Sequence, residues 1–264
     1  MTATMAPAGS PAPAGSLVGG RNLYGYAIGI LMIEGRFPRP PGAIGNATSF
    51  PFPVMHHVVP GASGVHTVRT LASMDPDSAA FDEAIRPWTD GARHLARQGV
   101  RAITTSCGFA ALFQRHLSAA VEVPVFASSL LLAPLVARML KPGRLVGVVT
   151  ADGDNLTKAH LAGAGVDPAT IATIGMEGCP EFAATSWDDQ PYLDYGRIEG
   201  ETVDVARRLV AREPRVGAIL LECSLLPPYA AAVQAATGLP VFDFTHLVTM
   251  VHDACARRPF VGLV

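Results

Sequence analysis

The chain has few charged residues and no long apolar run, and each of these absences excludes a class of binding partner. Charged residues make up 16 % of the 264 residues, the net charge is -2, and no run of Lys or Arg exceeds two. A basic footprint for a phosphate backbone is missing, so we expect no nucleic-acid partner. The longest apolar segment, 130–140, is interrupted by Pro134 and Arg138 and falls short of the ~20 residues of a membrane span. We expect a soluble protein with no membrane contact.

Cysteine is also scarce, and no two cysteines are spaced in the sequence in a way that suggests a disulfide framework or a metal site. The four cysteines are Cys107, Cys179, Cys223 and Cys255, with no Cys-x-x-Cys pair. A chain of this size needs no disulfides, so we predict reduced thiols and a cytoplasmic location. The spacing does not match a zinc site, and no Gly-x-x-x-x-Gly-Lys phosphate loop occurs. We therefore predict no metal and no cofactor.

What the chain does contain is an internal duplication. An apolar run ends at Cys107, and sixteen residues separate it from Pro-Val-Phe at 124–126; sixteen also separate Cys223 from Pro-Val-Phe at 240–242. The apolar segments 27–35 and 145–153 repeat the match upstream, at an offset close to that between the cysteines. Landmarks that keep their order and spacing favour two copies of one α/β unit over chance.

Short apolar runs alternate with helix-period segments, which is typical of parallel strands covered by helices on both faces. Expected strands lie near 24–33, 54–59, 101–106, 123–127, 144–150, 171–176, 216–222 and 239–243. Expected helices cover 78–98, 110–120, 129–140, 155–163, 198–213, 227–237 and 245–257. The pattern predicts an α/β fold of two pseudo-symmetric halves, each a parallel sheet flanked by helices, with the active site in the cleft between them.

The same pattern predicts how the chain divides. Residues 1–22, rich in Ala, Pro, Gly and Ser and without the features of a secretory signal, are expected to form a disordered tail. The first half would span 23–141 and the second 142–264, with the alternative that 239–264 crosses over to the first. Segment 178–196 has no helical or strand period, and a loop of this length is typical of a functional lid.

The two thiols are the strongest candidates for chemistry. Cys107 and Cys223 each follow a strand end, where ligands bind in parallel α/β sheets. Gly108 and Ser224 come next, and they allow a tight turn whose N–H groups bind a carboxylate and favour a thiolate. Burial as a small apolar group is the alternative for a single cysteine, but the duplicated position favours function. Two thiols facing one substrate carbon suit stereochemical inversion, with one removing a proton and the other returning it.

The duplicated half, the strand-end thiols and Leu-Glu-Cys-Ser at 221–224 resemble the aspartate/glutamate/hydantoin racemase superfamily, over about residues 24–252. The resemblance implies cofactor-independent racemisation by Cys107 and Cys223, and it aligns Glu34 with a polar position after the first strand. Many members have Asn-Thr after the first cysteine, where this chain has Gly108-Phe109. That departure removes a polar contact and adds an aromatic wall.

Four further residues are weighed for substrate binding. With the family geometry, Asn46 and Thr48 would contact a substrate carboxylate, although ordinary turn chemistry explains them equally well. Arg36 would grip a second carboxylate. His246 would assist one thiol only, since the first half has Leu130 at that position, and a helix cap at its neighbours is the competing explanation.

One acidic residue is expected to lie outside the cleft. Glu222 precedes Cys223, and neighbouring residues of a strand point to opposite faces. On this basis we expect its carboxyl to take no part in the site.

Taken together, the residues predict an isomerase: a racemase or epimerase of a small carboxylate substrate of the aspartate or glutamate type, forming a homodimer. The first alternatives are a maleate-type isomerase and an arylmalonate-type decarboxylase, which would use the cysteines unequally. A thiol hydrolase is more distant. The alternative from another class is a non-catalytic protein that binds an amino acid.

Overall fold

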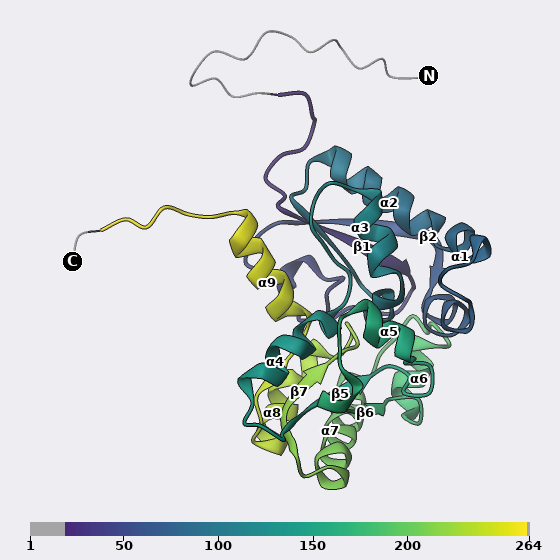
Figure 1. The fold of residues 1–264 in the computed structure, drawn as a ribbon, viewed down its shortest axis with the longest axis vertical. Helices are drawn as coiled ribbons and strands as arrows, with labels where there is room; N and C mark the ends of the chain where they lie inside the picture. Colours follow the sequence, from purple (N-terminus) through teal and green to yellow (C-terminus); the bar gives the residue numbers. More distant parts are fainter. Residues whose placement is uncertain (1–18, 263–264) are drawn as a thin grey trace.

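Two four-stranded parallel sheets with the same strand order form the framework of the molecule (Figure 1). The computed structural model describes residues 19–262, so most of the predicted tail 1–22 lies outside the described residues. The first sheet has the order β2-β1-β3-β4 and the second β6-β5-β7-β8. The predicted duplication and the α/β fold class are therefore confirmed.

All eight expected strands are present. They are β1 (Ile28–Glu34), β2 (Val54–Ser63), β3 (Ala102–Thr105), β4 (Val125–Phe126), β5 (Leu145–Thr150), β6 (Ile171–Gly175), β7 (Val216–Leu221) and β8 (Val241–Phe242). The central strands β1 and β5 are buried along nearly their whole length. This explains their unbroken apolar runs, because helices cover both faces of each sheet.

Nine α-helices occur among the described residues. They are α1 (Ala79–Ala84), α2 (Arg86–Gln98), α3 (Gln114–Ala120), α4 (Ala133–Met139), α5 (Lys158–Gly163), α6 (Pro180–Ser186), α7 (Tyr195–Arg212), α8 (Ala230–Thr237) and α9 (Phe244–Cys255). None of the helices within 19–262 has the length and apolarity to cross a bilayer.

Equivalent helices pack on equivalent strands. Leu95 of α2 and Leu209 of α7 are both fully buried. A Cβ at Gly29 of β1 would lie 3.0 Å from Leu95, and one at Gly147 of β5 would lie 2.9 Å from Leu209. The missing side chains thus let a leucine approach the central strand in each half.

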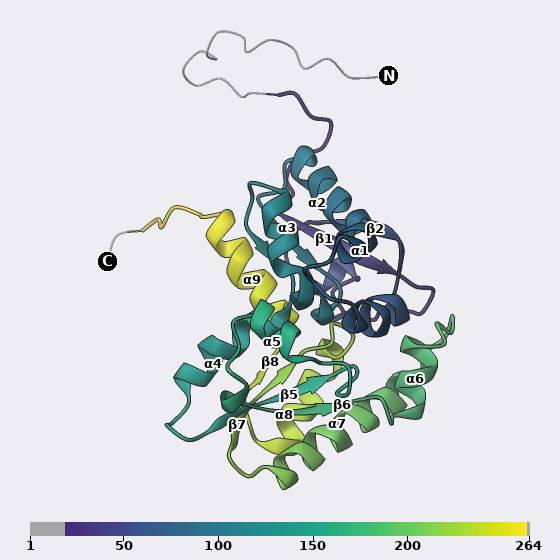
Figure 2. The ribbon, with the colours of Figure 1, turned by 45° about the vertical axis from the view of Figure 1, so that its right-hand side comes forward.

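The last helix lies beside the first half in both views (Figures 1 and 2). On α9, the carbonyl of Cys255 accepts a hydrogen bond of 2.7 Å from Arg101, and the His252 ring stacks 3.5 Å from that of Phe52. Helix α4 contacts β5 of the second half. Each half therefore carries a helix from the other half's sequence, while the boundary at 141/142 stays a prediction.

Two expected elements differ. The helix expected over 78–98 is divided into α1 and α2, because Pro87 lacks an N–H and fits only a first helical turn. Segment 178–196 was expected to be irregular, yet it contains α6 and the start of α7. The first turn of α6 is capped from afar, since Glu201 accepts the N–H groups of Glu181 and Phe182 at 2.8 and 2.9 Å.

Candidate active site

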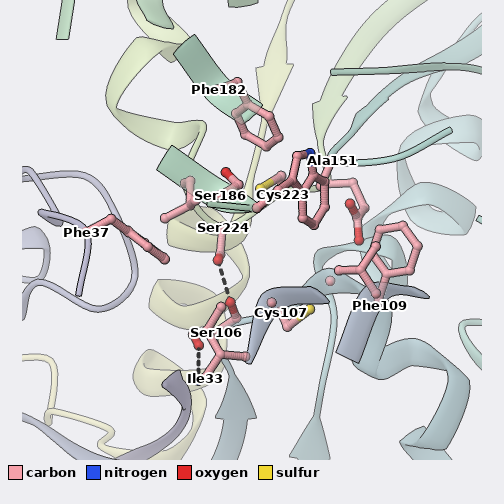
Figure 3. A pocket seen from close by; sticks show the side chains of 16 residues that line it. Ile33, Phe37, Ser106, Cys107, Phe109, Ala151, Phe182, Ser186, Cys223 and Ser224 are labelled. Carbon is pink, nitrogen blue, oxygen red and sulfur yellow. Dashed lines mark hydrogen bonds between the residues drawn. The ribbon is translucent and has the colours of Figure 1, made fainter. Parts of the chain in front are cut away.

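A pocket lies where the carboxyl ends of the two sheets meet, with about 410 Å³ of empty space including its mouth. This is the place where parallel α/β sheets bind ligands. Both halves line it (Figure 3). Four of the predicted site residues do so: Cys107, Gly108, Cys223 and Ser224.

The two thiols are buried and approach the pocket from opposite halves (Figure 3). Burial, helped by the charge of Glu222, raises the pKa of Cys107 to about 12, against the lowering effect of the Phe109 and Ala110 N–H groups. Burial and Glu222 also raise the pKa of Cys223 well above its usual value. Both thiols are therefore protonated at neutral pH, and a thiolate forms only if a neighbouring group accepts the proton.

The two strand ends are tied together by hydrogen bonds. The Ser224 hydroxyl donates to the Ser106 carbonyl at 2.6 Å, and the Ile33 N–H donates to the Ser106 hydroxyl at 2.9 Å (Figure 3). The first bond ties the turn after Cys223 to the end of β3 before Cys107, and the second ties that end to β1. Ser224 thus lies in the pocket wall, but its hydroxyl hydrogen is already committed to Ser106.

The expectation that Glu222 lies outside the cleft is wrong. Strand β7 ends at Leu221, so strand alternation no longer sets the direction of the next side chain. Glu222 is fully buried and lines the pocket. Its Oε2 accepts a hydrogen bond of 2.8 Å from Thr150, while Oε1 has no partner among the described residues. Burial raises its pKa to about 7, although Thr150 and the Ala151 N–H lower it.

Aromatic side chains form much of the remaining wall: Phe37, Phe109, Phe182 and Trp187. No lysine or arginine is among the lining residues within 19–262. The nearby Arg69 guanidinium stacks on the Trp187 ring at 4.4 Å and pairs with Asp152 at 3.0 Å. The site is therefore apolar, with its ionisable groups limited to two thiols and one carboxyl.

Helix α6 and the residue after it supply polar groups to the pocket. Ser186 and Trp187 both line it, and the Ser186 Oγ and Trp187 Nε1 atoms are buried without a hydrogen-bond partner in the described part of the chain. Buried donors in proteins are nearly always paired. These two point to a polar ligand group. Both lie in segment 178–196, which the sequence marks as typical of a functional lid, but no sequence pattern singles out the two residues.

The structure does not bring Asn46 and Thr48 into the pocket. The Asn46 side chain accepts hydrogen bonds from the Thr48 N–H at 2.9 Å and hydroxyl at 2.7 Å. Its amide donates to the Arg39 carbonyl at 2.8 Å. These are the turn interactions named as the alternative, and they leave the polar groups of this loop occupied.

Three further candidates also lie outside the lining. Glu34 accepts a hydrogen bond of 2.8 Å from the Gly61 N–H, because β1 ends facing the bend of β2. Arg36 is largely exposed and pairs with Asp189 at 3.3 Å. His246 lies 3.1 Å from Asp243, which caps α9 and raises the pKa of His246 through that hydrogen bond.

Solved structures of known proteins identify the class. The chain resembles arylmalonate decarboxylase (18 % identity, 89 % of this chain and 97 % of that chain, TM-score 0.51) and an allantoin racemase from Pseudomonas fluorescens (15 %, 90 % and 100 %, 0.52). An aspartate racemase from Picrophilus torridus is 12 % identical, and the match covers 89 % of this chain and 96 % of that chain with a TM-score of 0.51. The molecule thus has the fold of the aspartate/glutamate racemase superfamily, and the predicted resemblance is confirmed.

Sequence relatives define the family more narrowly. A dimethylsulfoniopropionate lyase of Durusdinium sp. clade D is 30 % identical over 228 residues, which are 84 % of this chain and 72 % of that protein. Dimethylsulfoniopropionate lyase 7 of Emiliania huxleyi (strain CCMP1516) is 31 % identical over 226 residues, 82 % of this chain and 63 % of that protein. The chain belongs to the dimethylsulfoniopropionate lyase family. No family model matches it.

These relatives correct the predicted activity. They are lyases, so the prediction of a racemase, and with it the isomerase class, is wrong. Of the alternatives, the decarboxylase agrees better, because a decarboxylase is also a lyase and has the same fold. The fold is shared across the superfamily, and it does not distinguish inversion from bond cleavage.

Proposed function

We propose that this protein is a lyase that cleaves dimethylsulfoniopropionate, with a pocket thiolate as the base. The observation that carries the proposal is its 30 % identity, over 84 % of the chain, to a lyase with that substrate name. The pocket adds chemical support, since two thiols lie inside an apolar, aromatic wall.

The substrate dictates what the site must do. In dimethylsulfoniopropionate the cationic sulfur and the carboxylate are attached to neighbouring carbons. A base removes a proton from the carbon next to the carboxylate, and that C–H electron pair becomes a C=C bond. The C–S bond breaks and its electrons leave with sulfur, so the products are dimethyl sulfide, acrylate and a base-bound proton.

Aromatic rings suit the sulfonium end of this substrate. Cationic groups without N–H donors bind to the faces of aromatic rings. Phe37, Phe109, Phe182 and Trp187 offer such faces, and the lining contains no lysine or arginine in the described chain to repel the cation. Phe109 is the residue that stands where many racemases have a polar one.

The carboxylate end requires hydrogen-bond donors. The Ser186 hydroxyl and the Trp187 indole N–H are buried at the pocket and unpaired in the described structure. Hydrogen bonds to a charged group are worth about 1.5–3 kcal/mol, and they strengthen as charge develops on the carboxylate during proton removal. Both groups therefore fit a substrate carboxylate.

The asymmetry of the pocket favours a one-base reaction. The Ser106 N–H donates to Leu31 and the Glu222 N–H donates to Val149, both at 2.8 Å, so Ser106 and Glu222 occupy equivalent positions in the two halves. One is a hydroxyl and the other a carboxyl. Inversion needs matched bases on two faces, whereas elimination needs a base on one.

Headspace gas chromatography of dimethyl sulfide, with purified protein and dimethylsulfoniopropionate, tests the proposal. We expect release by the wild type, a loss of about 10²–10⁴-fold when the thiol that acts as base becomes serine, and a smaller loss for the other of Cys107→Ser and Cys223→Ser. Cys255→Ser is the control, because that thiol lies outside the pocket.

Two results would count against this function. Equal and complete loss in both pocket variants would favour a two-base reaction. If the protein releases no dimethyl sulfide but releases carbon dioxide from an arylmalonate, the proposed substrate is wrong. The one-base mechanism would still apply to the new substrate.

A further inference from the structure

Glu222 is the feature of the pocket that neither the family nor the thiols explain. A carboxyl group that is fully buried normally has its oxygens hydrogen-bonded. Here Oε2 accepts a hydrogen bond from Thr150, while Oε1 is buried beside the pocket without a partner in the described chain. This oxygen is therefore available to accept a proton.

Its free oxygen lies against the turn that follows the other thiol. Any Cβ at Gly108 would collide with Oε1 of Glu222 and would lie 2.7 Å from the Glu222 carbonyl oxygen. Gly108 follows Cys107, while Glu222 itself precedes Cys223. The carboxyl is thus packed between the two thiol-bearing turns, and its negative charge acts on both sulfurs.

We infer that Glu222 is the proton acceptor that turns a pocket thiol into a thiolate. The inference rests on the proposed function. The S–H proton moves to the Glu222 carboxylate and leaves a thiolate. The thiolate takes the substrate proton as dimethyl sulfide departs, and the Glu222 carboxyl then returns its proton to solvent. The net reaction releases one proton, as the elimination requires.

The surroundings leave Glu222 as the group for this task. From β5 and the residue after it Glu222 meets the uncharged Thr150 hydroxyl and the Ala151 N–H, and the titratable groups of the two turns that feel its charge are the thiols of Cys107 and Cys223. In the segment after β5, Asp152 is already paired with Arg69. His160 of α5, which packs against Phe109, is buried and has its pKa lowered to about 4, so it is neutral and adds no positive charge.

The first test replaces Glu222 by glutamine and reads two quantities that should fall together. Dimethyl sulfide release should fall at least 100-fold, since the thiol proton loses its acceptor. Iodoacetamide alkylation of Cys107, followed on its peptide by mass spectrometry at pH 7.5, should slow about tenfold for the same reason. A carboxylate that only repels a thiolate would give the opposite result, because its removal lowers the pKa of the thiol and accelerates alkylation.

The second test uses Thr150→Val. Glu222 must be ionised to accept a proton, so the rate should rise with pH through its pKa. Removing the Thr150 hydroxyl raises that pKa, and the rising limb should move to higher pH. Thr104→Val is the matched control: Thr104 is equally buried, but its hydroxyl donates to Phe126 in the first sheet.

A third readout needs no substrate. A carboxyl whose folded pKa is near 7 and whose unfolded pKa is 4.5 makes the folded state lose stability as pH rises between those values. The melting temperature of the wild type should therefore fall relative to Glu222→Gln between pH 5 and pH 8. Alkylation that is unchanged or faster in Glu222→Gln, or parallel melting curves, would overturn the inference.

The readouts separate the two proposals. If the wild type releases no dimethyl sulfide but Glu222→Gln slows alkylation, the substrate is wrong and the proton acceptor stands. If release occurs and Glu222→Gln retains it within threefold, the lyase stands and the role of Glu222 is refuted.

Discussion

Gly108 has a steric reason to lack a side chain, and this reason connects the two thiol turns. Alanine there would place its Cβ 2.7 Å from the Glu222 carbonyl oxygen, which belongs to the backbone and cannot rotate away. Glycine at this position removed a polar contact expected from the racemases, and in the structure it makes room for a carboxyl from the other half.

We expect Gly108→Ala to unfold with about 1–3 kcal/mol less stability and to lose most of its turnover, because the backbone and the Glu222 carboxyl must shift apart. Thermal melting and dimethyl sulfide release measure the two effects. Gly200→Ala is the control, since nothing lies within 4 Å of a Cβ at that position of α7. It should gain about 0.5–1 kcal/mol. Wild-type behaviour of Gly108→Ala would contradict the packing described.

At this scale the sequence predicts only part of the site. Cys107 and Cys223 were found because each ends an apolar run at a repeated position. Glu222 was misplaced because the argument from alternation needs to know where the strand ends, and β7 stops one residue before it. The segment that contains Trp187 was marked as typical of a functional lid, but no pattern within it identifies this side chain as part of the pocket.

Helix α6 shows why an element can be missing from a sequence prediction. Its first turn is stabilised by Glu201, which lies in α7 and is about twenty residues away along the chain. No serine, aspartate or similar cap precedes it; the capping position is Cys179, whose side chain makes no cap hydrogen bond. The strands were predictable because each buried strand is a continuous apolar run, which can be recognised in the local sequence.

The end of α6 is also where substrate binding should be most sensitive. Trp187→Phe keeps an aromatic face against Arg69 but removes the indole N–H. If that N–H binds the substrate carboxylate, KM should rise about 10- to 100-fold with a smaller change in kcat, in line with about 1.5–3 kcal/mol for a hydrogen bond to a charged group. Steady-state kinetics of dimethyl sulfide release measure this.

Tyr192→Phe is the matched control for that variant. Tyr192 lies in the same segment and also loses one polar hydrogen, but its side chain is exposed and outside the pocket. An equal rise in KM for both variants would show that KM responds to any substitution in this segment. The indole N–H of Trp187 would then not be a substrate-binding group.

At the scale of the whole molecule, the duplication predicted the repeated sheet order and the place of the pocket but not how the halves are joined. Helices α4 and α9 each pack beside the sheet of the opposite half. Local sequence patterns carry no information on which sheet a helix will cover. The homodimer remains a prediction.

The halves also share their cores, which has a consequence for unfolding. Leu31 of β1 and Val149 of β5 belong to one apolar cluster, and Ile30 and Val148 belong to the other. Neither half can lose its packing without exposing part of the other. A chain of 264 residues is long enough to form two independently unfolding domains. The shared cores predict instead that the two halves unfold together.

We expect urea to unfold both halves in one transition. The chain has two tryptophans, Trp88 in α2 of the first half and Trp187 after α6 of the second. Fluorescence of Trp187→Phe therefore reports the first half, and fluorescence of Trp88→Phe reports the second. In each variant the fluorescence midpoint should coincide with that of the far-ultraviolet circular dichroism, which reports all helices. A fluorescence midpoint in either variant that clearly precedes its dichroism midpoint would show that this half unfolds alone, and that the crossed helices do not bind the halves into one cooperative unit.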